Sequence, residues 1–176
     1  MPSNTYTLIS SVTVGSGGSS GVTFSSIPQT YTDLLVKCSL RTGSAQVWGY
    51  FTYNGSSTTG YSLMQLLGNG STASSGKDAT STGYQYSLWA DSPNQTANTF
   101  SSSEIYIPNY TGSTYKSNSI ESVTENNATG VYTAMQTNLW SNTAAITSIT
   151  FTPWNSGGGE TWAQYSTFYL YGIKNS

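Results

Sequence analysis

Alternation of apolar and polar residues is the pattern that most constrains how this chain folds. It is clearest over residues 34–40, where Leu34, Val36, Cys38 and Leu40 are separated by mostly polar positions. A period of two places successive side chains on opposite faces of an extended strand, whereas a surface helix repeats its apolar residues every three or four positions. Helical spacing is nearly absent from the chain. The pattern predicts a β protein, with Cys38 packed in the core as a small hydrophobe.

The same pattern predicts many short strands separated by turn-forming residues, of which we expect about eight to ten to build the fold. The candidate ranges are 6–14, 22–24, 34–40, 47–53, 61–67, 84–90, 104–107, 115–124, 131–140, 147–152 and 162–173. With no helix to carry a parallel crossover, such a chain is predicted to be all-β, an antiparallel β-sandwich of jelly-roll-like form. We expect a single domain over 1–176, with 1–5 as an N-terminal arm and 68–82 as an exposed loop.

The first predicted strand has an apolar face formed by Tyr6, Leu8, Val12 and Val14, interrupted at Ser10. A glycine and serine segment, VGSGGSSGV at 14–22, follows it. This segment contains the G-x-S-x-G pattern of hydrolase nucleophile elbows, but the chain has no histidine to activate a serine, and a strand follows in place of a helix. A phosphate-binding loop needs the same missing helix. We therefore interpret the segment as a hairpin loop joining the first two strands.

Charge excludes several classes of partner. Only 7% of residues are charged, the net charge is -2, and the five basic residues are dispersed along the chain. A protein that neutralises a phosphate backbone needs clustered lysine and arginine, so nucleic acid is not an expected partner. The chain shows no signal-peptide pattern and no apolar run long enough to cross a bilayer, which predicts a protein made in the cytoplasm and not inserted in a membrane.

Catalytic and metal chemistry has few residues to draw on. With no histidine, one cysteine and seven carboxylates without calcium-loop spacing, no metal ligand set, catalytic group or cofactor site is predicted. A calcium site made of backbone carbonyls stays open at this point. Glu121 and Glu125 lie four residues apart in an extended segment, about 13 Å at 3.3 Å per residue, which is too far for a glycosidase pair. Glu104 with Glu121 or Glu160 stays open, but we expect the protein not to be an enzyme.

Aromatic residues are the better functional candidates. They make up 14% of the chain, including five tryptophans. A tryptophan face suits the apolar face of a sugar ring, while its N–H can bind hydroxyl groups. The alternative, which we favour, is that these residues form the core and an oligomer interface of a chain poor in aliphatic residues. Trp48, Trp89 and Trp154 lie off the main apolar register or beside turns, so they are the candidate contacts for a glycan or a partner.

Four stretches of the sequence resemble a family of small virion proteins of tailed bacteriophages, notably phages of aquatic bacteria. They are YTLISSVTVGSGGSSGVTFSSIPQTYTDLLVKCSLR, SSSEIYIPNYTGSTYKSNSIESVTENNATG, LWSNTAAITSITFTP and YSTFYLYGI. The resemblance spans most of the chain in matching order. Residues 47–91 and 153–164 match less clearly, and we expect individual specificity to lie there.

The resemblance implies a jelly-roll-like β-sandwich on the virion surface, commonly a trimer, that decorates the capsid or forms a fibre or tail knob. It implies no catalytic residues. The chain has no heptads and no collagen-like repeat for a shaft, which favours a capsid decoration or cement protein that contacts the major capsid protein and itself. The alternative is a tail-fibre or receptor-binding module that recognises host surface glycans through exposed Trp and Tyr.

Overall fold

The computed structural model describes residues 5–45, 47–56, 60–78, 85–125, 130–154 and 158–174, and all regular structure in them is β-strand. The predicted all-β class is confirmed. Twelve strands form within the described residues: β1 (Tyr6–Thr13), β2 (Val22–Phe24), β3 (Asp33–Leu40), β4 (Trp48–Tyr53), β5 (Tyr61–Gly68), β6 (Ala73–Asp78), β7 (Gln85–Trp89), β8 (Ser101–Ile107), β9 (Lys116–Glu125), β10 (Val131–Trp140), β11 (Ile149–Pro153) and β12 (Thr167–Ile173). No helix in this part of the chain is long and apolar enough to cross a membrane.

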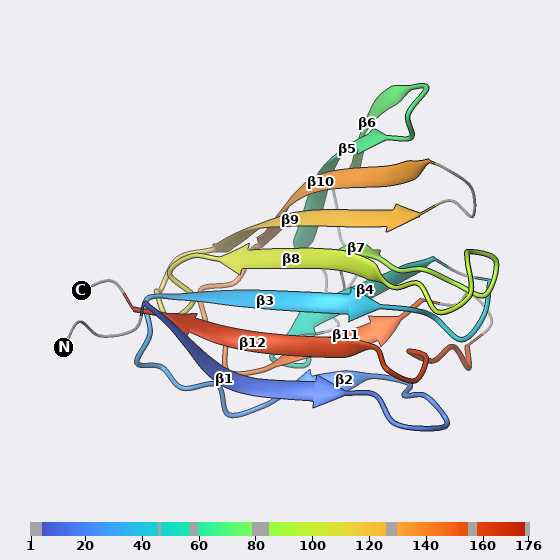
Figure 1. Cartoon of the computed structure of the whole chain (residues 1–176). Helices are drawn as coiled ribbons and strands as arrows, with labels where there is room; N and C mark the ends of the chain where they lie inside the picture. The colour runs from blue at the N-terminus through green and yellow to red at the C-terminus, as the bar shows by residue number, and fades with distance from the viewer. Residues whose placement is uncertain are drawn as a thin grey trace.

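The strands form two sheets that pack as an antiparallel sandwich (Figure 1). The large sheet has eight strands in the order β1-β12-β3-β8-β9-β10-β5-β6, and the small sheet has four in the order β2-β11-β4-β7. Every strand pair is antiparallel. Consecutive strands along the chain lie in different sheets, except at the steps β5–β6, β8–β9 and β9–β10, which stay within the large sheet.

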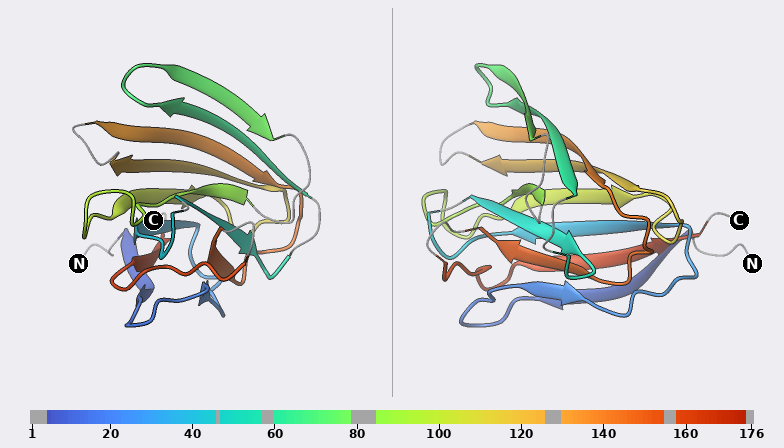
Figure 2. Two further views of the ribbon diagram at one scale, coloured as in Figure 1. Left: turned by 90° about the vertical axis from the view of Figure 1, so that its right-hand side faces the viewer. Right: turned by 180° about the vertical axis from the view of Figure 1, so that it is seen from behind.

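Two antiparallel strand pairs are inserted into this exchange between the sheets. The β5–β6 pair lies in sequence between β4 and β7, and the β9–β10 pair lies between β8 and β11. Both join the large sheet, and β10, β5 and β6 continue it past β7, the last strand of the small sheet (Figure 2). We call β10, β5 and β6 the overhang. A cleft lies between the inner face of the overhang and the edge of the small sheet.

Aromatic side chains fill much of the core between the sheets. Trp162 is fully buried, and its ring lies 5.6 Å from that of Phe168, which lies 5.3 Å from Phe151. Trp140 is 2% exposed and stacks on Tyr61. Large rings supply the burial that the scarce aliphatic side chains cannot. The interpretation of the tryptophans as core residues is therefore correct for Trp140 and Trp162.

The face predicted for β3 is confirmed, since Leu34, Val36, Cys38 and Leu40 are all buried. Burial raises the pKa of the Cys38 thiol well above its usual range, which keeps the sulfur protonated and unreactive.

The interpretation of 14–22 as a hairpin loop is wrong. β1 pairs with β12 in the large sheet, whereas β2 pairs with β11 in the small one, so the segment crosses between the sheets. It is held against the strand-free stretch before β12, where Ser19 and Trp162 exchange two backbone hydrogen bonds of 3.0 and 2.8 Å. The apolar pattern of β2 is the same whichever sheet it joins, so the local sequence did not distinguish the two outcomes.

The single apolar face predicted for the first strand is also wrong. A β-bulge between Leu8 and Ser10 shifts the register of β1 on β12. The extra residue moves the side chains that precede it to the other face. Tyr6 and Leu8 are consequently exposed, while Val12 packs against the core and Val14 is buried.

Two further expectations concern the rest of the chain. The exposed loop predicted for 68–82 contains β6, a strand that the alternation did not reveal because most of its residues are exposed and few are apolar. Of the predicted N-terminal arm at 1–5, only Thr5 is described, and its carbonyl accepts a hydrogen bond from the Lys174 N–H.

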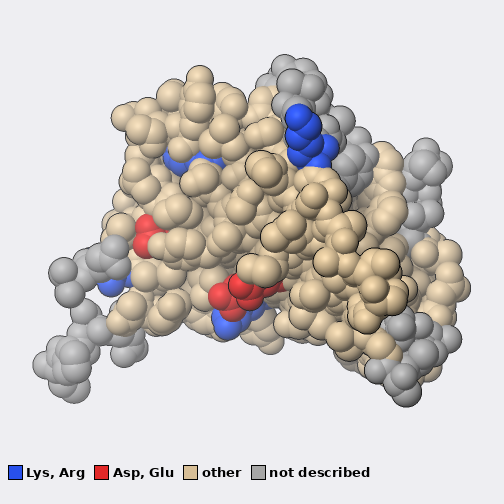
Figure 3. All heavy atoms as spheres, turned by 90° about the horizontal axis from the view of Figure 1, so that it is seen from above, with Lys and Arg blue, Asp and Glu red and all other residues tan. Residues whose placement is uncertain are grey.

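Charged side chains are sparse over the face seen in Figure 3.

Candidate functional site

The three tryptophans singled out from the sequence lie together at one end of the small sheet. Trp48 opens β4 and Trp89 closes β7, and the two are direct register partners. Their rings meet edge to face, with centroids 6.0 Å apart and an interplanar angle of 80°. Trp154 follows β11, and its backbone N–H donates to the Trp48 carbonyl at 2.9 Å. Antiparallel pairing of three strands therefore brings together residues more than a hundred positions apart.

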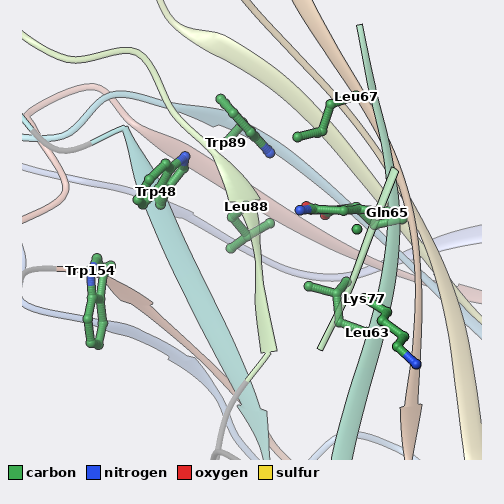
Figure 4. A pocket seen from close by; sticks show the side chains of 10 residues that line it. Trp48, Leu63, Gln65, Leu67, Lys77, Leu88, Trp89 and Trp154 are labelled. Atoms are coloured by element: carbon green, nitrogen blue, oxygen red, sulfur yellow. The ribbon is translucent and has the colours of Figure 1, made fainter. Parts of the chain in front are cut away.

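These rings form one wall of a cleft between the small sheet and the overhang, which we call the aromatic cleft. Its volume is about 510 Å³, and it is lined by Trp48, Leu63, Gln65, Leu67, Gly76, Lys77, Leu88, Trp89, Gln136 and Trp154. Figure 4 shows the tryptophans on one side, Leu63, Gln65 and Leu67 on the other, and Leu88 between them. Small-molecule sites usually measure about 300–1,000 Å³ and combine apolar walls with a few polar groups.

Two carboxamides provide the polar groups of the aromatic cleft. Gln65 and Gln136 are cross-strand partners on β5 and β10, and the Gln136 Nε2 donates to the Gln65 Oε1 at 3.3 Å. Gln136 is only 3% exposed, and its Oε1 has no hydrogen-bond partner among the described residues. An unpaired buried acceptor costs about 1–3 kcal/mol of stability. The chain keeps this acceptor where an apolar residue would pack more favourably.

Gly76 makes room for the amide pair. It lies opposite Gln65 on β6, and a Cβ at this position would stand 3.0 Å from the Gln65 Nε2 and 3.4 Å from its Cγ. The Gln65 side chain therefore lies across the β6 backbone, and it reaches toward the tryptophan wall in Figure 4. A side chain at position 76 would press on the amide that holds Gln136.

The cleft continues at one end past Trp89. Tyr132 on β10 stacks on Trp89, with centroids 6.4 Å apart and an angle of 20° between the rings. A second cavity of about 140 Å³ shares Leu67 and Trp89 with the aromatic cleft and is also lined by Tyr132. A bound molecule longer than the cleft has a partly aromatic path in this direction.

Charge is almost absent from the aromatic cleft. Lys77 is the one charged residue among the described residues that line it, and in Figure 4 its ammonium group turns away from the tryptophans. Among the described residues that line the cleft, none carries a carboxylate, hydroxyl or thiol. These residues offer flat apolar faces, and amide groups that both donate and accept hydrogen bonds.

The buried charged residues outside the cleft are occupied by the fold. The Glu160 carboxylate accepts from the backbone N–H groups of Gly43 and Ser44 at 3.0 Å each, and the Lys116 Nζ donates to the carbonyls of Gly112 and Thr114. Burial lowers the pKa of Lys116. These contacts fasten loops, so neither group is positioned for chemistry.

The remaining acidic pair considered from the sequence lies on the outer face of the large sheet. Glu104 and Glu121 are cross-strand partners, and Glu104 forms an ion pair with Lys37 at 2.8 Å. Glu160 lies elsewhere, bound to the loop at 43–44. Within the described residues, no group of three or more Cys, Asp or Glu is placed to hold a metal ion.

Comparison of the chain with protein-family models, curated proteins and solved structures finds no match. The site must therefore be interpreted from its own geometry. All of the described residues that line the aromatic cleft, except Gln136, fall within 47–91 and 153–164, the two segments where individual specificity is expected from the sequence.

Sequence reasoning found the tryptophan wall but missed Gln65, Gly76 and Gln136. A signal for Gln136 was present. The buried face of β10 consists of Ala134, Gln136, Asn138 and Trp140, so an amide occupies a position where alternation calls for an apolar residue. Gln65 and Gly76 carried no such signal, because their role depends on the pairing of β5 with β10 and β6.

Proposed function

We propose that this protein is a structural component of bacteriophage virions, a capsid decoration or cement protein on the outside of the shell. It forms a trimer and contacts the major capsid protein. Its action is adhesive, because symmetric subunits that bridge neighbouring capsomers add buried surface across seams that internal pressure would open. The resemblance of four sequence stretches to phage virion proteins supports this proposal.

The strand order supports a jelly-roll form for the sandwich. Without the two inserted strand pairs, the sheets are β1-β12-β3-β8 and β2-β11-β4-β7. Eight strands that alternate in this way between two four-stranded antiparallel sheets make up a jelly roll, an architecture found in viral capsid proteins and in lectins. The inserted pairs then add a surface that the jelly roll itself does not need.

The observation that carries the proposal is an exposed apolar patch on the outer face of the large sheet. Met64, Leu66, Val123 and Met135 lie on this face and are 65%, 61%, 43% and 56% exposed. We call these four residues the outer patch. Contiguous exposed apolar side chains on a soluble protein usually mark a contact with another protein.

The charges around the outer patch favour contact between copies of this chain. Lys77 and Glu121 flank a groove of about 530 Å³ that includes Met64, Leu66 and Met135. They stand three strands apart, about 14 Å at 4.8 Å per strand. Opposite charges on the two sides of one apolar patch suit a head-to-tail contact, and such contacts close into rings such as a trimer.

Imaging of labelled virions tests the location. Virions of the encoding phage that carry a small tag on this protein are examined by electron microscopy with a gold-conjugated probe. Label spread over the capsid is the expected result. Label confined to tail tips would replace decoration with the receptor-binding alternative, and label absent from particles would overturn the virion proposal altogether.

Sedimentation of the purified protein tests the outer patch. We expect the parent chain to sediment as a trimer and Met135→Glu to sediment as a monomer, because a carboxylate in the contact is costly to desolvate. Leu8→Glu is the matched control, since Leu8 is 51% exposed and lies on β1, at the opposite edge of the same sheet. A monomeric parent chain, or equal effects of the two variants, would contradict the assignment.

The aromatic cleft favours a second candidate function. A receptor-binding module for host surface glycans needs an exposed aromatic surface with hydrogen-bonding groups beside it, and Trp48, Trp89 and Trp154 form such a surface. On β5 and β10, the side chains of the outer patch and those of the aromatic cleft lie on opposite faces of the sheet, so one protein has room for both contacts.

A further inference from the structure

We propose that the aromatic cleft binds a neutral saccharide, whose apolar ring face packs on the tryptophan wall while one of its hydroxyl groups donates to the Gln136 Oε1. The inference deepens the second candidate function by naming the ligand class and the residues that select it. It does not depend on where the protein sits in the virion.

The tryptophan wall fits a ring with one apolar face. Trp48 is 42% exposed, and it meets Trp89 edge to face, so the two rings present surfaces in nearly perpendicular planes. Tyr50 supports Trp154 from the side at 6.2 Å. Aromatic rings held by their neighbours offer contact area with little loss of side-chain freedom. A pyranose, which carries C–H groups on one face and hydroxyls at its edge, matches such a surface.

The buried amide points to a hydroxyl donor. The Gln136 Oε1 is an acceptor without a partner among the described residues, on a side chain that is 3% exposed and lines the cleft. The oxygen itself is buried, so the carboxamide must turn toward the cleft for a ligand hydroxyl to donate to it and satisfy this group. Sites built to hydrogen-bond a hydroxyl reject analogues that lack it, because the buried polar group is then left unpaired. Gln136 is therefore the residue that we expect to set specificity.

The sparse charge points to a neutral ligand. An acidic sugar is usually held by arginine or by a metal ion, and the described cleft lining contains neither arginine nor a set of carboxylates. Its one cation, Lys77, turns its ammonium group away from the tryptophans (Figure 4). Proline-rich peptides also dock on aromatic grooves. A proline ring has no donor, however, and would leave the Gln136 acceptor unpaired, so the observations favour the saccharide.

The test is binding of the purified full chain to three sets of probes: neutral oligosaccharides of glucose, galactose, mannose and N-acetylhexosamines, acidic oligosaccharides with sialic or uronic acids, and a decaproline peptide. We expect binding to members of the neutral set, confirmed by calorimetry and by a change in tryptophan fluorescence. Trp89→Ala should weaken the affinity at least tenfold. Tyr165→Ala, which removes a 66% exposed aromatic ring outside the cleft, should leave the affinity unchanged.

Gln136→Leu separates a binding role from a structural one. Because the variant removes a buried unpaired acceptor, we expect its melting temperature to equal or exceed that of the parent, while its affinity for the neutral saccharide falls at least tenfold. A melting temperature that falls together with the affinity would show that the amide is structural. Gly76→Ala should weaken binding less, since it displaces Gln65 by only a few tenths of an ångström.

The remaining outcomes are decisive as well. Absence of binding to all neutral probes overturns the inference, as does equal binding by Trp89→Ala. Preference for the acidic set or for decaproline would replace the neutral saccharide with that ligand. Because these measurements use isolated protein, their failure leaves the capsid location to be judged from labelled virions alone.

Discussion

Tyr53 and Tyr61 belong to a chain of buried polar contacts that joins β4, β5 and β9. The Tyr61 hydroxyl accepts from the Tyr53 N–H at 3.0 Å, and the Tyr53 hydroxyl accepts from Asn118 at 2.9 Å. Asn138 donates in turn to Asn118 at 3.2 Å. Burial raises the pKa of Tyr61 to about 12 and raises the pKa of Tyr53 well above its usual value. Both phenols therefore stay protonated in the folded chain when an unfolded chain would ionise them.

Alkaline unfolding should reveal this burial. The folded state holds the tyrosine protons more tightly than the unfolded state does. The resulting gain in stability is complete below pH 10 and, for Tyr61, is lost as the pH rises through 12. Each such tyrosine lowers the free energy of unfolding by up to about 1.4 kcal/mol per pH unit in that window. We expect the free energy of unfolding, measured in urea, to fall less steeply between pH 10 and 12 for Tyr61→Phe than for the parent.

The matched control for that titration is Tyr115→Phe, because Tyr115 is 59% exposed. Its unfolding free energy should follow the parent at every pH. Tyr61→Phe also loses the acceptor for the Tyr53 N–H, so its absolute stability is lower and the slope against pH is the informative quantity. Identical slopes for Tyr61→Phe and the parent would contradict the assigned burial.

At the scale of the strands, apolar–polar alternation predicted the strands that have one buried face. It did not predict which sheet a strand joins or which face is buried where distant residues decide this. β3, β9 and β10 were predicted to within one residue at each end, whereas β8 was predicted only from residue 104 because its first three residues are serines. β6 lies at the end of the overhang with mostly exposed residues, so no apolar period marks it. The three candidate tryptophans could be selected from the sequence because they lie off the apolar register or beside turns. That they lie together could not be predicted, because it depends on the pairing of β4 with β7 and β11.

The crossing segment between β1 and β2 provides a test at this scale. Gly17 and Gly18 both have positive φ, +94° and +75°. A Cβ at Gly17 meets nothing within 4 Å, whereas a Cβ at Gly18 would stand 2.8 Å from the Trp162 carbonyl oxygen. We expect Gly17→Ala to cost about 1 kcal/mol from backbone strain alone. Gly18→Ala adds a collision with the Trp162 carbonyl oxygen and should lower the free energy of unfolding by about 2–4 kcal/mol in total.

Urea unfolding of the two variants measures this difference directly. If the segment were a loop with no contacts to the sandwich, the two variants would lose similar amounts of unfolding free energy, because only the left-handed backbone conformation would matter. A larger loss at Gly18 would show that the segment is docked on Trp162 and forms part of the sandwich.

At the scale of the whole molecule, the sandwich and the overhang differ in how they are held. The eight strands β1-β12-β3-β8 and β2-β11-β4-β7 enclose most of the aromatic core, and residues such as Leu34, Phe151 and Phe168 are fully buried. Among the described strands of the large sheet, the β5–β6 pair is hydrogen-bonded only to β10, and Tyr61 at the start of β5 packs on Tyr53 in the core. The pair carries part of the outer patch on one face and part of the aromatic cleft on the other. A strand pair at the edge of the fold thus contributes to both proposed surfaces.

Hydrogen exchange should follow this division. Segments with few buried contacts open with a lower free energy than the core does. We expect the amides of β6 to exchange fastest among the strands and those of β3 and β8 slowest, with β1, the other edge of the large sheet, between them because Val12 packs on the core. The measurement uses Met135→Glu at neutral pH, so that contact between copies does not protect the overhang. Exchange in β6 as slow as in β3 would mean that the overhang unfolds together with the sandwich, and that its exposed faces are presented by a rigid surface.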